Sequence, residues 1–344
     1  MLSKVIAPNV WTWLSAKIGR DIVVLRIGAV LSGIFLMGVF FLHDFWVLVI
    51  LLFTYSFFRD ALLPQMEVLT LGHLGTQANR YGQIRLWGSM GFIVSVMGLG
   101  YLFDSVSVAA LPNYLAVTVM AIIVMSFIVP GAPVPLDIQH TTPSIFQVIL
   151  RKEVIVFLLI GALLQFSHAP YYTFYTLFLE QHAYSKSTAG SLWALGVLAE
   201  VVLFIYAHRI FMRVSDYNLL SISLLLTAVR WGLIASFPDS LLLLAMAQLL
   251  HAASYGACHA ASMRIIHFYF PGKLEVHGQA LYVSFCFGAG GALGAFYASY
   301  SWSNYGAHFS FLMAAAACVI ATLLAFFGPR PEKAQREKTD DSMD

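Results

Sequence analysis

One carboxyl group, that of Glu200, stands in the middle of a membrane-length run of apolar residues. An ionisable side chain at the depth of a bilayer costs at least about 2.5 to 3.5 kcal/mol to insert, so each such residue calls for an explanation. A carboxyl group in a space that is alternately wet and dry can take up and release a proton. Glu200 is therefore our first candidate for proton coupling. A neutral carboxyl that joins two helices by hydrogen bonds is the alternative.

Three further charged residues fall within the apolar segment 45–71: Arg59 and Asp60 near its middle, and Glu67 nearer its cytoplasmic end. Helical spacing places Asp60 and Glu67 on one face and Arg59 about 100° away. Adjacent residues of a helix do not face each other, so we expect no direct neutralisation between Arg59 and Asp60. Arg59 could bind an anion with Asp60 or Glu67 as a coupling carboxylate, or these residues could bridge neighbouring helices. For Glu67 we favour a contact at a cytoplasmic gate.

A polar stripe runs along the segment 240–263, where Gln248, His251, Tyr255 and His259 recur at helical steps of three and four. Lipid offers no partners to such a stripe, so it must face protein or water. We interpret it as a wall of a substrate cavity. A zinc site is the weaker interpretation, because the two histidines lie about 12 Å apart along a helix axis and no HExxH motif is present. We expect neither a metal nor a cofactor.

A second polar face occurs in the segment 154–179, where Gln165, His168 and Tyr172 flank Pro170. Proline loosens a membrane helix at a point where a gate could flex. Imidazole titrates near neutral pH in water, so His168 is a second candidate for the proton, with a packing role as the alternative. Gln165 and Tyr172 are candidates for substrate contact, as is Trp193 on the face of Glu200.

Arg230 lies in the apolar segment 218–237. It could pair with Glu200 or with a bound carboxylate. It could equally extend to the outer membrane surface beside Trp231, as long basic side chains near helix ends do.

The composition places all of these residues in lipid: 60% of the chain is hydrophobic, 10% is charged, and the mean hydropathy is +0.79. The small net charge of +2 argues against a nucleic-acid partner. A phosphate-binding GxxxxGK[ST] loop and a nucleophile motif are both missing from the sequence, which disfavours an ATP-driven pump and an enzyme.

A membrane-crossing helix needs about 20 apolar residues. By that measure we predict an all-α membrane protein with ten complete spans, at 22–42, 45–71, 84–103, 108–130, 154–179, 190–212, 218–237, 240–263, 278–299 and 306–328.

Basic residues are distributed unevenly between the loops. Fourteen lysines and arginines, from Lys17 to Lys338, fall on one side of the predicted spans, whereas the opposite loops hold only Lys186. Cytoplasmic loops carry the excess of basic residues. We therefore expect a multi-pass protein of the cell inner membrane whose C-terminus is cytoplasmic.

The chain divides into two halves that look like copies of one unit. Gly82-Gln83 ahead of one span matches Gly278-Gln279 ahead of another, and a basic turn recurs at the same offset of 196 residues. A shared offset is typical of the repeats that form the two bundles of many transporters. We expect an N-terminal bundle at 1–130, a cytoplasmic linker at 131–153, a C-terminal bundle at 154–328 and a charged tail at 329–344.

The same offset leaves the first spans of the second half without counterparts. We therefore expect Met1–Leu14 to be the cytoplasmic end of a second helix, with about 40 further residues upstream and twelve spans in all. A short interfacial or re-entrant N-terminus is the alternative.

The segment IAPNVWTWLSAKIGR (6–20) resembles the end of the second helix and the basic turn of major facilitator superfamily transporters. The segments RYGQIRLWGSMGF (80–92), SHAPYYTFYTLFLE (167–180), SLWALGVLAEVVLF (191–204) and GQALYVSFCFGAGGALG (278–294) together resemble the 3-phenylpropionic acid transporter branch, the lactose-permease-like group. The resemblance covers essentially the whole chain. It implies two six-helix bundles around a central cavity, and proton symport.

The resemblance also implies a gating role for the basic turn, of which Lys17, Gly19 and Arg20 are kept. Thr12 and Ala16 stand where glycine and aspartate are usual, so the salt bridge normally credited to that aspartate is missing from the pattern. We expect a monomer whose partners are a small organic solute, protons and the bilayer. The suggested solute is an aromatic carboxylate such as 3-phenylpropionate. A nucleoside or sugar symporter is the first alternative, and a non-transporting or inactive membrane protein is the second.

Overall fold

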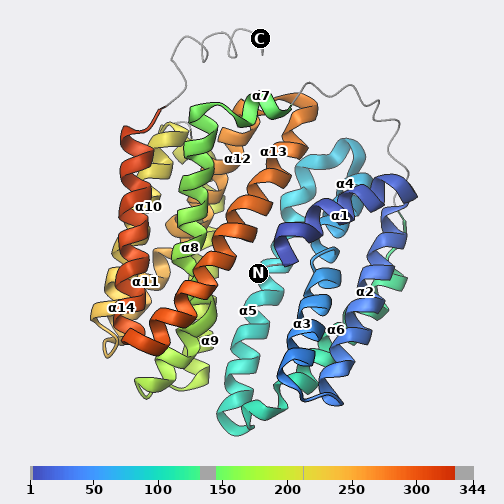
Figure 1. Cartoon of the computed structure of the whole chain (residues 1–344), viewed down its shortest axis with the longest axis horizontal. Helices are drawn as coiled ribbons and strands as arrows, with labels where there is room; N and C mark the ends of the chain where they lie inside the picture. Colours follow the sequence, from blue (N-terminus) through green and yellow to red (C-terminus); the bar gives the residue numbers. More distant parts are fainter. Residues whose placement is uncertain (1–2, 132–144, 212, 330–344) are drawn as a thin grey trace.

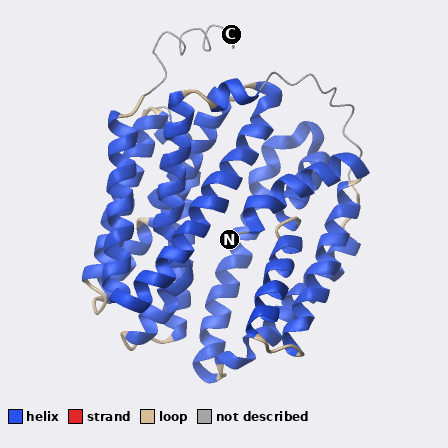
Figure 2. Cartoon of the chain, viewed as in Figure 1, coloured by secondary structure: helices blue, strands red, loops and turns tan. Residues whose placement is uncertain are grey.

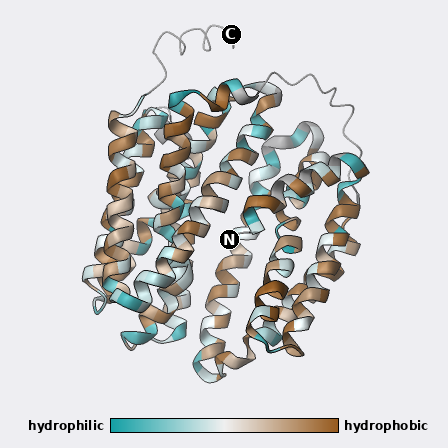
Figure 3. Cartoon of the chain, viewed as in Figure 1, coloured by the Kyte–Doolittle hydropathy of each residue, from teal (hydrophilic) through white to brown (hydrophobic). Residues whose placement is uncertain are grey.

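The computed structural model describes residues 3–131, 145–211 and 213–329. Within these ranges the ordered elements are helices and no strand occurs, which confirms the all-α prediction (Figure 2). Hydrophobic residues extend along the helices (Figure 3), and many large ones are exposed, such as Trp87 at 76% and Phe45 at 67%. Exposed apolar side chains in such numbers fit a lipid environment.

Within each part of the chain, the described helices follow one another with short turns. The first part of the chain forms α1 (Ser3–Ile18), α2 (Asp21–Met37), α3 (Phe45–Arg59), α4 (Leu62–Leu74), α5 (Tyr81–Ser105) and α6 (Leu111–Ile128). The second part forms α7 (Ile145–Ile149), α8 (Lys152–Gln181), α9 (Lys186–Phe211), α10 (Asp216–Ser236), α11 (Leu241–Leu249), α12 (Cys258–Tyr269), α13 (Glu275–Tyr282) and α14 (Gly291–Phe327). Two π-helical segments, η4 (Ala252–Ala257) and η6 (Val283–Gly290), join α11 to α12 and α13 to α14.

Nine helical stretches among the described residues are long and apolar enough to cross a membrane. The longest, Glu275–Phe327, contains Gly306 with a φ of +83°, a backbone conformation that favours glycine. The orange to red part of the chain reverses direction at the bottom of Figure 1, so this stretch corresponds to the last two predicted spans. The predicted spans are thus all found, with ends that differ by a few residues.

Helices α1 to α6 stand on one side of Figure 1 and α8 to α14 on the other. We call these the first and second sets of helices. They meet where α5 packs on α9 and where α1 packs on η6. Of the predicted linker, residues 132–144 lie outside the described residues, and its end forms α7 and the start of α8. The described part of the predicted tail ends at Pro329. The domain boundaries themselves stay a prediction.

Interruptions of regular helical geometry occur at corresponding positions in the two sets, separated by the 196-residue offset seen in the sequence. The break between α3 and α4, at Asp60–Ala61, lies 196 residues before the end of η4. The turn at Ala110, in the short 3-10 helix Val108–Ala110, lies 196 residues before Gly306. Interruptions of this kind inside helices often mark functional sites, and η4 lies beside the cavity described next.

Candidate functional site

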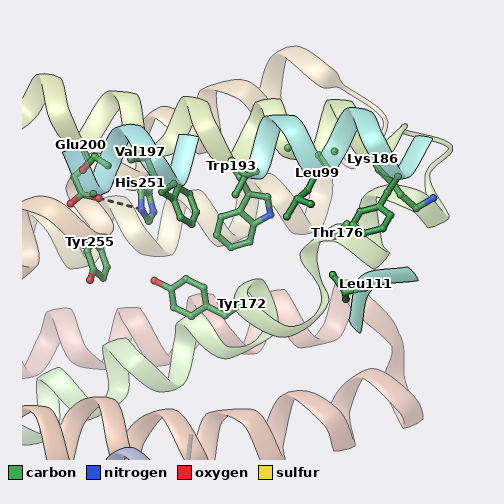
Figure 4. A pocket seen from close by; sticks show the side chains of 18 of the residues that line it. Leu99, Leu111, Tyr172, Thr176, Lys186, Trp193, Val197, Glu200, His251 and Tyr255 are labelled. Atoms are coloured by element: carbon green, nitrogen blue, oxygen red, sulfur yellow. Dashed lines mark ion pairs between the residues drawn. The ribbon is translucent and has the colours of Figure 1, made fainter. Parts of the chain in front are cut away.

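A cavity of about 720 Å³ lies between α5 of the first set and helices α8, α9 and η4 of the second set. Figure 4 shows side chains from these elements directed into it. Its lining combines aromatic and aliphatic groups with a few charged ones, which is the usual make-up of a small-molecule site. The lining residues that carry polar or aromatic groups are Arg85, Ser89, Phe92, Phe103, Tyr172, Thr176, Glu180, Lys186, Trp193, Glu200, His251 and Tyr255.

Five of the residues singled out in the sequence line this cavity: Tyr172, Trp193, Glu200, His251 and Tyr255. They come from three different helices, α8, α9 and the region of η4, so the fold brings together residues that are distant in sequence. Figure 4 shows Glu200 and His251 facing each other at one end of the group. Their closest atoms, Glu200 Oε2 and His251 Nε2, are 3.6 Å apart.

Two glycines make room for this pair. A Cβ atom on Gly256 would lie 3.1 Å from Cγ of Glu200, and one on Gly196 would lie 3.2 Å from Cβ of His251. Larger residues at either position would have to displace the functional side chain. The sequence therefore keeps small residues where α9 and η4 approach each other.

Arg230 is fully buried, and its guanidinium donates to several neutral groups. Nη1 bonds to Ser254 Oγ at 2.8 Å and to His251 Nδ1 at 3.2 Å, and Nη2 bonds to Gln248 Oε1 at 3.1 Å. The predicted alternative, extension to the membrane surface, is wrong for the described structure, because these bonds draw the side chain into the protein. No carboxylate pairs directly with Arg230 among the residues described.

The contact with Arg230 fixes how His251 is protonated. An arginine has only donors, so His251 Nδ1 must accept the hydrogen bond with its lone pair. A neutral ring then carries its hydrogen on Nε2, the atom that faces Glu200. The arrangement is a chain of three groups in which the imidazole links a buried cation to a carboxyl in the cavity.

Aromatic rings back the cavity wall between these groups. The ring of Tyr171 lies between the Arg230 guanidinium, at 4.3 Å, and the ring of Trp193, at 4.2 Å. Gln248 accepts a hydrogen bond from the Tyr171 hydroxyl at 2.9 Å and donates one to the Tyr175 hydroxyl at 2.7 Å. Gln248 thus lies behind the wall, where it orients the tyrosines.

The remaining members of the two polar faces do not themselves line the cavity, although the ring of His168 stacks on that of Tyr172, with ring centroids 5.6 Å apart. His168 is buried, with Nδ1 2.9 Å from the Leu164 carbonyl oxygen, and its Nε2 finds no partner among the described residues. Gln165 and His259 border a separate small space beside Tyr255. Pro170 is buried within α8, which continues as a helix on both sides of it.

The predicted separation of Arg59 and Asp60 is wrong. Arg59 Nη2 lies 2.9 Å from Asp60 Oδ1. The reason is that α3 ends at Arg59 and α4 begins only at Leu62, so the spacing rule for a continuous helix does not apply here. Asp60 also accepts a hydrogen bond from Ser3 in α1 at 2.7 Å. This pair lies outside the lining of the cavity as the described residues outline it.

Sequence reasoning missed Arg85, which it counted only as a basic residue of a cytoplasmic loop. Arg85 lines the cavity near the start of α5, and its side chain is 52% exposed. Glu67 of α4 lies 3.9 Å from it. A helical wheel of α5 places Arg85, Ser89, Phe92 and Val96 on one face, and this is the signal that could have identified it.

The basic turn between α1 and α2 has a simple geometry. Gly19 has a φ of +66° and ends α1, which is the usual role of glycine after a helix. Arg20 precedes the first residue of α2, and the ammonium of Lys17 lies over the Trp13 ring at 5.1 Å. The structure shows no contact between this turn and the cavity among the described residues.

Comparisons with known proteins agree on one family. A family model described as the MFS_1 like family matches residues 1–313. The chain is 32% identical to the "Probable 3-phenylpropionic acid transporter" of Escherichia coli (strain K12) over 270 residues, which cover 77% of this chain and 69% of that protein. It is 26% identical to the "Maltose permease" of Geobacillus stearothermophilus over 261 residues, 74% of this chain and 62% of that protein.

Solved structures show the same fold. The nucleoside transporter NupG superposes with a TM-score of 0.80 at 16% identity, covering 95% of this chain and 88% of that one. A bacterial homologue of the lysosomal transporter Spinster, in an inward-facing and unoccupied conformation, gives a TM-score of 0.68 at 14% identity, covering 94% and 85%. At these identities the likeness concerns the fold alone.

Proposed function

Because this chain belongs to the MFS_1 like family of membrane transporters, we propose that it moves a small organic acid together with a proton. The solute would bind in the cavity between the two sets of helices, which would open toward each side of the membrane in turn. The observation that carries the proposal is the position of Glu200: a carboxyl in the cavity wall, 3.6 Å from an imidazole that a buried arginine holds in place.

Glu200 is the proposed proton carrier. It lines the cavity, so it can exchange a proton with whichever solution the cavity faces. His251 is less suited to that role, since a proton on Nδ1 would face the Arg230 guanidinium and break the hydrogen bond between them. His168 is less suited as well, because its ring is buried against Tyr172 and does not itself line the cavity.

An aromatic carboxylate is the proposed solute class. The relative from Escherichia coli is named for 3-phenylpropionic acid, and the cavity offers a matching pair of features. Trp193 and Tyr172 provide nearly parallel ring faces, 18° apart, for a phenyl group. Arg85 provides a guanidinium for a carboxylate, and its present partner, Glu67, lies at the long distance of 3.9 Å. A solute carboxylate can therefore compete with Glu67 for Arg85.

Arg59 is our less favoured anion site, because Asp60 already neutralises it.

For the orientation in the membrane, we propose that the end of the molecule with Arg85 and the start of α8 faces the cytoplasm, as the distribution of basic residues predicts. That is the upper end in Figure 1. The membrane would be the inner membrane of the cell.

A sugar symporter is the second candidate, favoured by the match to a protein named as a maltose permease. A sugar would use the aromatic faces and the hydroxyls of Tyr172, Thr176 and Tyr255, and it has no carboxylate for Arg85 to bind. The charge of the solute therefore separates the two candidates.

The deciding experiment follows the pH of a weakly buffered suspension of energy-depleted cells that express the chain. Pulses of 3-phenylpropionate, a nucleoside or maltose are added. We expect alkalinisation with 3-phenylpropionate alone, and its loss in Glu200→Gln. Alkalinisation with maltose instead would replace the proposed solute class. Unchanged pH during measurable uptake of labelled solute would refute proton symport.

A further inference from the structure

The first turn of α9 is capped by a residue of the other set of helices. The N–H groups at the start of a helix have no partner within it. Asp104, in the last turn of α5, accepts from the backbone N–H of Lys186 at 2.7 Å and from that of Ser187 at 3.3 Å. The Ser185 hydroxyl accepts the next one, from Thr188, at 3.1 Å. Two of the first three N–H groups of α9 are thus satisfied only from α5.

The same ends of α5 and α9 also touch through their backbones. A Cβ atom on Gly190 would lie 2.3 Å from the carbonyl oxygen of Val96, and one on Gly100 would lie 2.7 Å from that of Lys186. Only glycine allows this approach without movement of one helix. Figure 1 shows these ends of α5 and α9 together at the bottom of the molecule, where α5 ends and α9 begins.

We propose that Asp104 is a positioning residue for transport: a carboxylate clasp that holds α5 on α9 in the state seen here and releases when the lower end opens. The proposal rests on the alternating access proposed above. α9 carries Trp193 and Glu200, and α5 carries Arg85, so the clasp sets the relation between the two walls of the cavity.

The clasp is suited to repeated release. The Asp104 side chain is exposed, so water can take over its hydrogen bonds and those of the two N–H groups when the helices part. Its interaction with the positive end of the α9 dipole falls off within one turn, so a small separation ends it. By contrast, the hydrogen bonds from Arg230 to Gln248 and Ser254 are fully buried, and they lie within the second set of helices.

The test measures distances between spin labels in the full chain, purified in lipid nanodiscs. One pair, Ser105→Cys with Gln181→Cys, reports the separation of the two sets at the lower end. A second pair, Arg80→Cys with Arg209→Cys, reports it at the upper end. The three native cysteines are buried, so the chain without introduced cysteines serves as the labelling blank. Neither a solute nor a proton gradient is needed, so a wrong substrate assignment leaves this test intact.

In Asp104→Ala we expect the ratio of longer to shorter distances at the lower pair to rise about fivefold. This is the typical effect of losing a helix cap. The upper pair should show the reciprocal shortening. Asp104→Asn should shift the distribution less than Asp104→Ala, because asparagine still caps the helix but lacks the charge that interacts with the α9 dipole.

Asp44→Ala is the matched control. Asp44 also caps a helix at a turn, accepting from the N–H groups of Trp46 at 3.0 Å and Val47 at 3.1 Å, but α3 belongs to its own set. This variant should leave both distributions unchanged. The proposal is overturned if Asp104→Ala leaves the lower distances as they were, or if Asp44→Ala shifts them equally.

Discussion

Nε2 of His251 lies 3.6 Å from Oε2 of Glu200, slightly beyond hydrogen-bond distance. The other ring nitrogen is held by Arg230 at 3.2 Å, so the imidazole cannot turn without losing that bond. A movement of α9 by a few tenths of an ångström is enough to make or break the contact with Glu200. The pair is therefore sensitive to the distance between α9 and η4.

Glu200→Gln should abolish accumulation of the solute against its gradient while exchange of labelled for unlabelled solute continues. Glutamine keeps the size and hydrogen bonding of the side chain but cannot exchange a proton. Accumulation and counterflow in membrane vesicles measure the two activities. Glu180→Gln is the control, because Glu180 lines the other end of the cavity and pairs with Lys186 at 3.8 Å. Equal loss in both variants would contradict a special role for Glu200.

His251→Phe should reduce accumulation at least tenfold, about 1.4 kcal/mol, because it removes the link between Arg230 and Glu200. His168→Phe should retain accumulation, since the His168 ring lies outside the cavity lining and bonds only to a carbonyl of its own helix among the described residues. The comparison uses initial rates and final levels at equal amounts of protein in the membrane. If His168→Phe lost accumulation and His251→Phe kept it, His168 would be the proton carrier instead.

Arg85→Gln should raise the KM for a carboxylate solute about tenfold or more, because a charge-assisted hydrogen bond contributes about 1.5 to 3 kcal/mol. The KM of Arg85→Lys should lie between those of the unaltered protein and Arg85→Gln, since lysine keeps the charge but lacks the planar fork of arginine. Arg59→Gln should leave KM unchanged. Uptake at graded solute concentrations gives these constants, and a KM unchanged in Arg85→Gln would exclude Arg85 as the carboxylate site.

Arg230→Gln should destabilise the protein by about 2 to 3 kcal/mol, because it removes three buried hydrogen bonds and leaves Nδ1 of His251 without the donor that the described residues give it. Arg59→Gln should cost less, because the Arg59 side chain is 45% exposed and the nearly buried Asp60 keeps its hydrogen bond from Ser3. Thermal unfolding in one detergent, followed by tryptophan fluorescence, compares the two. Similar Tm values would show that burial of Arg230 contributes little.

Gly190→Ala should lower the rate of transport, since its Cβ would force α9 away from the Val96 carbonyl of α5. The strain of such an inserted group is typically about 1 to 3 kcal/mol. Gly98→Ala, two residues after Val96 on α5, meets nothing within 4 Å and should be neutral. Initial uptake rates at saturating solute, normalised to protein, distinguish the two. Full activity of Gly190→Ala would show that the contact is looser than described.

The membrane spans could be predicted because each is a long apolar run, and the positions of Glu200, His251 and Tyr255 followed from helical periodicity. The offset of 196 residues found in the sequence also relates Ala110 to Gly306, although the sequence analysis did not predict interruptions at these positions. These are properties of single helices or of their order, which periodicity and length report directly.

Contacts between helices could not be predicted from periodicity and length. The pairing of Arg59 with Asp60 depends on the break at Asp60–Ala61. Pro64 marks this break, because proline cannot donate to the carbonyl four residues earlier and its ring clashes with that carbonyl, but the sequence reasoning did not use this signal. Arg230 offered no signal for choosing between the surface and the interior, because the choice is made by Gln248 and Ser254 on another helix. Asp104 was not considered at all, because its partners are backbone N–H groups that every sequence contains.

Helix α1 connects two regions that lie in different sets. Ser3 donates to Asp60 beside the break between α3 and α4, while Val5, two residues further on, lies 3.0 Å from where a Cβ on Gly288 of η6 would stand. One turn of α1 is thus fastened to the first set by its hydroxyl and rests on the second set by its backbone. A single turn of α1 therefore spans the distance between η6 and the break at Asp60.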